Sequence, residues 1–227
     1  MRRCVVSLAV ALAVVASASV NKSVQAQSVQ RYLVSITNMT RAQSFTPILV
    51  ATHTSAVRLF TPGTAASSEL REVAEEGNIG PLTTLLRGRP LEVRDIASSS
   101  GLLTPGVTVD VVVMAGGQFD RVSLVSMLIP TNDAFFGATG LPLPAANEIT
   151  IIDVPAYDSG TEQNDERCAS IPGPDFSECG GPGGGARVGG GEGVVIIHNG
   201  IHGVGDLRAS NRDWRNPVAR IIVRRQL

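Results

Sequence analysis

The sequence is poor in the residues on which several classes of protein depend. Aromatic residues make up 4% of the 227 residues, so few side chains are available to stack on nucleic-acid bases. The formal net charge is −1, which gives no excess of positive charge to attract a phosphate backbone. We therefore expect no nucleic-acid partner.

Motifs of common enzymes are also missing. The chain has no Gly-x-Ser-x-Gly nucleophile elbow and no His-Glu-x-x-His zinc motif. Its three cysteines include no Cys-x-x-Cys pair. Two acids such as Asp133 and Asp158 could serve a glycosidase, but a sequence does not give the separation of their carboxylates. We expect a protein that is not an enzyme.

No apolar run beyond the N-terminus approaches the roughly 20 residues that a membrane-spanning helix requires. The first 26 residues contain Arg2 and Arg3, an apolar stretch over residues 5–16 and a small-residue site that ends at Ala26. This pattern is typical of a secretory signal peptide. We expect cleavage near Ala26, a secreted or periplasmic protein without a transmembrane segment, and a single domain over residues 27–227.

Two cysteines, Cys168 and Cys179, lie beyond the predicted cleavage site. An oxidising compartment favours a disulfide between them. A bridge across so short a loop would stabilise the fold by roughly 3 kcal/mol in the chain-entropy model. The alternative is two free thiols.

The hydrophobic pattern indicates an all-β protein with short helices. Residues 31–37 alternate as a strand, and the valines of residues 107–115 share one face. Gly116 and Gly117 then suggest a hairpin between that strand and residues 122–129. From Ser67 the period changes to that of an amphipathic helix that Gly77 can terminate. Further strands are expected over residues 193–199 and 218–223.

Residues 180–193 read GGPGGGARVGGGEG. So many glycines predict a flexible loop instead of a packed element. A phosphate-binding loop is excluded, because no Gly-Lys-Ser/Thr follows and the next element is predicted to be a strand.

Two apolar runs each end at a proline that is followed by acidic residues. Residues 124–129 are followed by Asp133, and residues 149–154 are followed by Asp158, Glu162 and Asp165. Carboxylates that converge from turns supply the oxygen ligands that a hard cation such as calcium prefers. The alternative is that these acids bond their local backbone, as turn residues commonly do.

Three segments of the chain resemble the spondin N-terminal domain family. They are LIPTNDAFFG (residues 128–137), AYDSGTE (156–162) and PVARIIV (217–223), and the resemblance runs from about Tyr32 to Val223. It implies an antiparallel two-sheet β-sandwich with one bound calcium ion. In such a sandwich, the one or two short helices that the pattern predicts belong in a crossover that covers a sheet edge. By the resemblance, the metal ligands are Asp133, Asp158 and Glu162. Ala134 stands where animal members usually have Trp, and Glu162 replaces an Asp.

The resemblance also implies a function. Spondin domains act in matrix and cell-surface adhesion, so it suggests a secreted calcium-binding module for extracellular or cell-surface binding. Its partner would be an extracellular protein or glycan, and we expect a monomer. Animal members are attached to thrombospondin-type repeats that this chain lacks, so their partners do not carry over.

A second hypothesis rests on the histidines. His53, His198 and His202 all lie in segments that resemble loops near strand ends, and together they could form a zinc or copper site. This would make the protein a secreted transition-metal binder or a metalloenzyme. The alternative is that His198 and His202 bond the neighbouring backbone and fix a turn.

Overall fold

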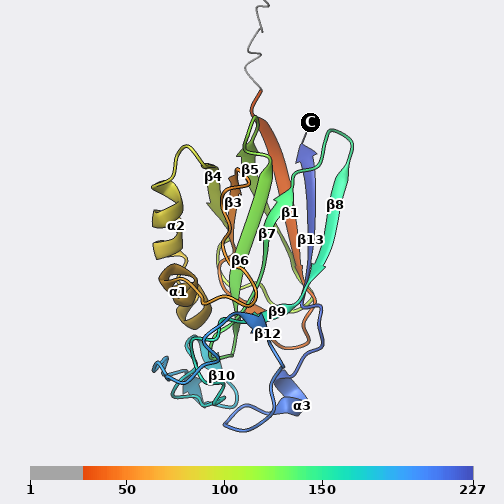
Figure 1. The fold of residues 1–227 in the computed structure, drawn as a ribbon. Helices are drawn as coiled ribbons and strands as arrows, with labels where there is room; N and C mark the ends of the chain where they lie inside the picture. The colour runs from red at the N-terminus through yellow and green to blue at the C-terminus, as the bar shows by residue number, and fades with distance from the viewer. Residues whose placement is uncertain (1–27, 227) are drawn as a thin grey trace, which may run out of the picture.

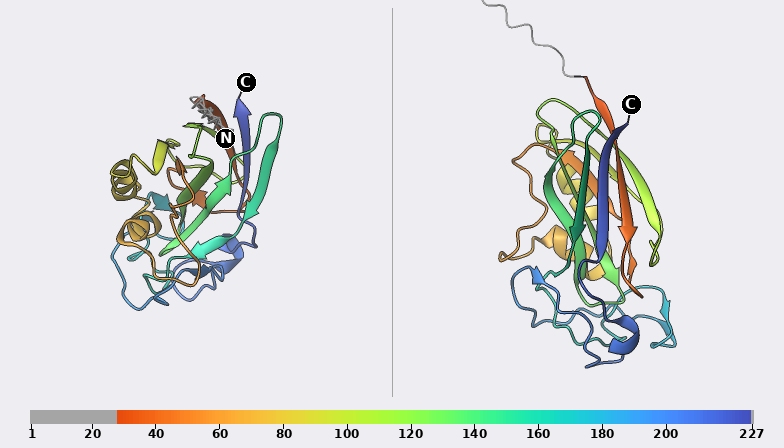
Figure 2. Two further views of the ribbon diagram at one scale, coloured as in Figure 1. Left: turned by 45° about the horizontal axis from the view of Figure 1, so that its top comes forward. Right: turned by 90° about the vertical axis from the view of Figure 1, so that its right-hand side faces the viewer.

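A computed structural model describes residues 28–226. The predicted signal peptide, residues 1–26, lies outside the described residues. Two antiparallel sheets face each other as a sandwich, with short helices beside them (Figures 1 and 2), which confirms the predicted all-β sandwich. No helix of residues 28–226 is both long enough and apolar enough to cross a bilayer.

The first sheet has four strands in the order β5-β1-β13-β8. Their bounds are β1 Gln30–Asn38, β5 Thr108–Ala115, β8 Ile149–Val154 and β13 Ala219–Gln226. All neighbours are antiparallel. The last strand of the chain is therefore an inner strand, which makes the C-terminal residues an integral part of the sandwich.

The second sheet has the order β12-β9-β7-β6-β3-β4, and the short β2 also pairs with β6. Its strands are β2 Ser44–Phe45, β3 Leu49–His53, β4 Val93–Ser98, β6 Arg121–Ile129, β7 Ala134–Pro142, β9 Ala156–Asp158 and β12 Ile196–Ile197. A small hairpin joins β10 (Asp175–Phe176) to β11 (Gly181–Pro182) outside both sheets.

The predicted hairpin between residues 107–115 and 122–129 is wrong. β5 pairs with β1 in the first sheet, whereas β6 pairs with β3 and β7 in the second. The turn at Gly116 and Gly117 thus carries the chain from one sheet to the other. Both strands turn apolar side chains toward the same core, which is why their patterns resemble those of a paired hairpin.

The main core fills the space between the sheets. β1 contributes Tyr32, Val34 and Ile36 on alternate positions, as its sequence predicts. From the second sheet, the rings of Phe45 and Phe136 meet with centroids 4.2 Å apart. Both rings are buried in the core between the sheets.

Helices α1 (Ser68–Glu76) and α2 (Gly80–Arg87) cover the outer face of the second sheet (Figure 1). The side chain of Ser67 accepts the N–H of Leu70 at the start of α1, and Gly77 ends it with φ +64°. These two helices and the sheet enclose a second core, which includes Leu70, Leu86 and Phe135. A third, single-turn helix is α3 (Ala209–Arg212).

The two ends of the sandwich differ. At the end we call the loop end, residues 159–195 and 198–218 fold into loops below the strands in Figure 1. At the opposite end, which we call the terminal end, β1 begins and β13 finishes, as the C label in Figure 1 shows. β6 runs from one end to the other, and its nine residues span about 26 Å.

Candidate functional site

Asp133 lies at the loop end, in the turn that connects β6 to β7. Its side chain is fully buried. Oδ2 accepts the backbone N–H groups of Thr161 (2.9 Å) and Glu162 (3.1 Å) and the hydroxyl of Ser159 (2.8 Å). Oδ1 is also buried but has no hydrogen-bond partner among residues 28–226. A buried carboxylate oxygen without a partner is costly, and so requires an explanation.

Asp158 ends β9 and is paired with Ala134, the residue after Asp133. Its Oδ1 accepts the N–H of Gly160 at 2.7 Å, and Oδ2 accepts the amide of Asn164 at 2.6 Å. The residue is 2% exposed. The sheet register therefore brings the two predicted acids side by side at the end of the second sheet.

Gly160 is required in the turn after Asp158. Its φ is +71°, and a Cβ there would lie 2.3 Å from the carbonyl oxygen of Val194. The close approach lets the turn pack against the incoming chain of residues 191–194, where Gly193 donates its N–H to Gly160. The site is thereby covered by the segment that leads to β12.

The electrostatics of the two aspartates are unfavourable for negative charge. Burial, followed by repulsion from Asp133, raises the pKa of Asp158 to about 7. Burial also raises the pKa of Asp133, although the N–H of Glu162 and the hydroxyl of Ser159 act in the opposite direction. In the described part of the chain, the ion-pair contact of Asp158 is with His198 at 4.0 Å, and that histidine is neutral at pH 7. Among residues 28–226, no arginine side chain lies within 4.0 Å of either carboxylate.

Glu162, the third predicted ligand, is also buried. Its backbone N–H bonds Asp133, but its carboxylate Oε1 accepts the N–H of Val188 at 2.9 Å. Burial is the main reason that its pKa is raised to about 7, and repulsion from Glu75 and Asp133 adds to it. Its carboxylate thus lies between α1 and the aspartate pair.

The three predicted ligands are therefore only partly gathered. Asp133 and Asp158 are adjacent, whereas the Glu162 carboxylate is turned to the backbone of the glycine-rich segment. Within residues 28–226, no group of three or more His, Cys, Asp or Glu side chains is already arranged around a metal position.

The glycine-rich segment, residues 180–193, packs closely at this site. A Cβ at Gly184 would lie 2.3 Å from the carbonyl oxygen of Ala169, and one at Gly191 would lie 2.5 Å from that of Gly160. Arg187 anchors the segment to α1, where it bonds Glu72 and lies 3.1 Å from Glu75. Glycine is therefore required at these positions, because backbone approaches backbone too closely for a side chain. The flexibility of the segment stays a prediction.

A directed chain of hydrogen bonds links Asp158 to the loop after β12. Gly200 donates its N–H to Nδ1 of His198 (2.9 Å), so the proton of the neutral ring is on Nε2. Nε2 lies 3.1 Å from Oδ1 of Asn164, whose amide donates to Asp158. Burial lowers the pKa of His198 to about 4, which keeps the ring neutral. Trp214 packs on this ring with centroids 5.0 Å apart.

The prediction of one site formed by His53, His198 and His202 is wrong. His53 pairs with Arg121 at the terminal end, about the length of β6 away from Asp133. Its Nδ1 donates to the carbonyl of Thr54, and its Nε2 accepts the hydroxyl of Ser123, each at 2.7 Å. The alternative interpretation of backbone bonding holds for His198.

Sequence reasoning missed Glu166 as an organiser of the loop end. Its buried carboxylate accepts the backbone N–H groups of His202 (2.6 Å), Gly203 (2.6 Å) and Val204 (3.0 Å). A carboxylate inside a curve of successive amides is a well-satisfied internal anion. The glycines of the His-Gly-Val-Gly stretch, residues 202–205, were the available signal, because they permit such a curve.

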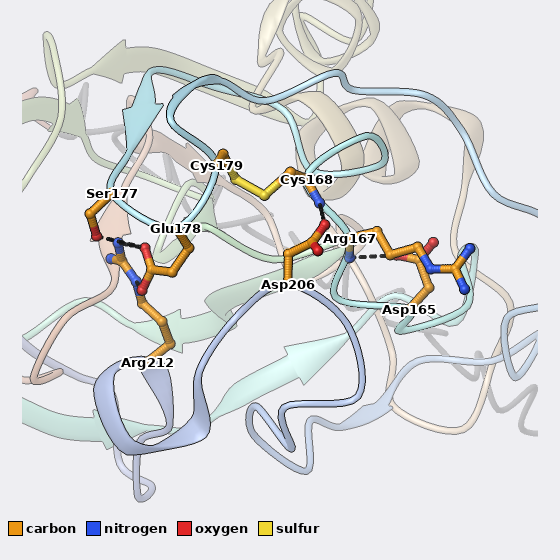
Figure 3. Close-up of a disulfide and its surroundings, with 8 residues drawn as sticks. All are labelled: Asp165, Arg167, Cys168, Ser177, Glu178, Cys179, Asp206 and Arg212. Carbon is orange, nitrogen blue, oxygen red and sulfur yellow. Dashed lines mark hydrogen bonds and ion pairs between the residues drawn. A yellow bond between two sulfur atoms is a disulfide. The ribbon is translucent and has the colours of Figure 1, made fainter.

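The predicted disulfide between Cys168 and Cys179 is present, with the Cα atoms 5.5 Å apart (Figure 3). Next to it, the Arg212 guanidinium binds both carboxylate oxygens of Glu178, at 2.9 and 2.7 Å. This bonding lowers the pKa of Glu178 to about 2. Asp206 accepts the N–H of Cys168 at 2.9 Å. These bonds attach the disulfide loop to α3 and to the loop around Glu166.

Comparison with known families agrees with the fold. The family model described as Spondin_N matches residues 32–167, which include Asp133, Asp158 and Glu162. No curated protein matches the chain.

Proposed function

The chain belongs to the spondin N-terminal domain family, and from this premise we propose that it is an extracellular binding module stabilised by one calcium ion. The family and the disulfide are both compatible with an extracellular or periplasmic protein. Asp133 and Asp158 would hold the ion, and Glu162 would join them if its carboxylate left the N–H of Val188. The module would act by binding, without catalysis, and as a monomer.

One observation supports the proposal above the others: Oδ1 of Asp133 is buried beside a second buried carboxylate and has no hydrogen-bond partner in the part of the chain that the structure describes. A hard cation would satisfy this oxygen and remove the repulsion between the two acids. The donors that the site offers are oxygens, which suits calcium and not a soft metal. Export to a calcium-rich space would make an affinity on the order of 10⁻⁴ to 10⁻³ M sufficient.

An ion at this position would join segments that are distant in the sequence. Asp133 belongs to the turn after β6, and Asp158 belongs to β9. Through Asn164 and His198, Asp158 is linked to the loop after β12. Calcium would therefore order the loops that form the exposed surface of the loop end (Figure 1), and we place recognition of an extracellular protein or glycan there.

The test is a calcium titration followed by thermal melts. We expect the wild-type melting temperature to rise in millimolar calcium relative to chelator, and the rise to disappear in Asp133→Asn. Asp120→Asn is the matched control, because it changes an exposed carboxylate at the other end of β6. Equal melting temperatures of the wild type in calcium and in chelator would overturn the proposal.

A pull-down addresses the binding role. Surface components captured by the wild type in calcium are expected to be released in chelator. An Asp110→Asn control, which changes an exposed carboxylate of β5, should capture them as the wild type does, and Asp133→Asn should not. Equal capture in calcium and in chelator, and by the wild type and Asp133→Asn, would show that recognition does not depend on the ion.

A further inference from the structure

At the terminal end, the core-facing side of β13 carries the charged residue Arg225 at a position where an apolar residue is expected. On β13, Ile221 and Val223 face the core, and the next inward position is Arg225. Arg225 is paired across the sheet with Tyr32 of β1. The space between the sheets at this end is therefore lined by a cation and an aromatic ring.

A hollow of about 880 Å³ opens here. Its lining includes Gln30, Tyr32 and Arg225 from the first sheet and Phe119, Asp120 and Leu143 from the turns at residues 116–120 and 143–145. The volume is in the range of sites that bind small organic molecules. A single inorganic ion would leave most of it unfilled.

Positive charge dominates the rim. A neighbouring hollow of about 610 Å³ is lined by Arg31, Arg224, Arg225 and Gln226, so Arg225 borders both. In the part of the chain that the structure describes, none of these arginines has an acidic side chain within 4.0 Å. There Nε of Arg225 is buried and has no hydrogen-bond partner.

The acid in the larger hollow does not balance this charge. Asp120 is 3.3 Å from Arg121, which neutralises it. Among the described residues, Arg225 donates one side-chain hydrogen bond, to the amide oxygen of Gln30, and its other donors have no protein partner there. A guanidinium with free donors selects ligands that carry carboxylate, sulfate or phosphate groups, which it binds with two parallel hydrogen bonds.

We infer that the terminal end binds an anionic oligosaccharide, meaning a chain of sugars that carries sulfate, phosphate or uronate groups. The partly exposed ring of Phe119, next to the mostly buried Tyr32, offers an apolar face to the C–H face of a sugar, and Arg225 offers its fork to the acidic group. Two hollows that share Arg225 fit a ligand longer than one ring. Arg31 and Arg224, which lie on the outer face of the first sheet, extend the positive track.

The test measures binding by calorimetry in about 0.15 M salt, with four probes. They are a heparin hexasaccharide, a hexagalacturonate, the neutral maltohexaose and sodium sulfate. We expect at least one anionic hexasaccharide to bind at least tenfold more tightly than maltohexaose and at least 100-fold more tightly than sulfate. Hexagalacturonate carries uronate groups alone and heparin carries uronate and sulfate groups, so tighter binding of heparin would show a contribution from sulfate.

Variants locate the site. Arg225→Gln should weaken binding at least tenfold, whereas Arg87→Gln, an exposed arginine at the end of α2, should change it less than twofold. Phe119→Ala should weaken the oligosaccharide about fivefold and leave its salt dependence unchanged, as expected for a stacking contact. If Arg225→Gln fails to fold, Arg225→Lys keeps the charge and should still weaken binding severalfold because it loses the fork.

Several outcomes would overturn the inference. They are equal affinities for maltohexaose and both anionic hexasaccharides, equal effects of Arg225→Gln and Arg87→Gln, or equal affinities for sulfate and the oligosaccharides. The inference does not rest on the calcium site, which is about 26 Å away along β6. Asp133→Asn should therefore bind the oligosaccharide as the wild type does, and loss of calcium stabilisation in that variant leaves the inference intact.

Discussion

In the metal-free protein, we expect Asp158→Asn to become more stable relative to the wild type as the pH rises. The pKa of Asp158 is raised by burial and by Asp133 from 3.8 to about 7 in the folded state. Between these two values the folded chain holds a proton that the unfolded chain has lost. The wild-type free energy of unfolding therefore falls as the pH rises toward 7, and Asn, which cannot ionise, does not share this fall.

The size of the effect follows from the pKa. Between pH 5 and 8, the folded carboxyl stays protonated over about two pH units, up to its pKa of about 7. Over these two units the wild-type free energy of unfolding falls by about 1.36 kcal/mol per unit. The stability of the variant relative to the wild type should therefore increase by about 3 kcal/mol over this range. For a domain of about 200 residues this corresponds to roughly 6–12 °C in melting temperature. A constant loss of about 1 kcal/mol is expected at every pH, because the new amide faces the donating amide of Asn164.

The assay is urea unfolding of both proteins in chelator at several pH values. Taking the difference between them removes the contribution of His198, whose pKa is lowered to about 4 mainly by burial and which titrates in both. Asp120→Asn controls for the loss of a carboxylate at an exposed position. In 5 mM calcium at pH 8 the wild type should regain about 1–2 kcal/mol, and Asp158→Asn should regain none.

Two results would refute the reasoning. If the difference in free energy of unfolding between wild type and Asp158→Asn does not change with pH, the pKa of Asp158 is not raised in the folded state. A calcium response in Asp158→Asn equal to that of the wild type would show that the ion, if bound, is held elsewhere.

Three further predictions concern the loop end. The double replacement Cys168→Ser/Cys179→Ser opens a loop with a sequence separation of 11 residues and should lower the free energy of unfolding by about 3 kcal/mol in urea melts; a loss below about 0.5 kcal/mol would contradict the chain-entropy estimate. Glu166→Ala should expose the amides of residues 202–204 and accelerate their hydrogen exchange, whereas unchanged exchange would mean that the carboxylate does not hold this loop. Gly160→Ala should cost at least 2 kcal/mol more than Gly63→Ala, since both have positive φ but only Gly160 meets backbone within 4 Å; equal melting temperatures would contradict this.

Local signals in the sequence predicted local structure well. Ser67 and Gly77 fixed the ends of α1, because a cap acts on the backbone of its own helix. The alternation of β1 predicted its buried face. Sheet membership was not predictable in the same way, since the inward valines of β5 and the apolar face of β6 look alike whether the strands pair or face each other across a core.

In the candidate site, too, some features could be predicted from local sequence and others could not. The positions of Asp133 and Asp158 followed from the prolines that end the preceding runs and from the family resemblance. The direction of the Glu162 carboxylate depends on the path of residues 186–190, which its own neighbours in sequence do not specify. Glu166 was missed because its amide partners lie 36 to 38 residues further along the chain.

The carboxylate of Glu166 belongs to the same chain as the amides that enclose it. Because this carboxylate is covalently attached, it cannot be diluted, dialysed away or captured by a chelator. The conformation of residues 202–204, which it holds, should therefore not depend on the ions in the medium. In the proposed site, by contrast, Asp133 and Asp158 would be held together by an ion that a chelator can remove. Removal of calcium should thus loosen the loops around Asp133 and Asp158 and leave the loop around Glu166 unchanged, although both belong to the loop end.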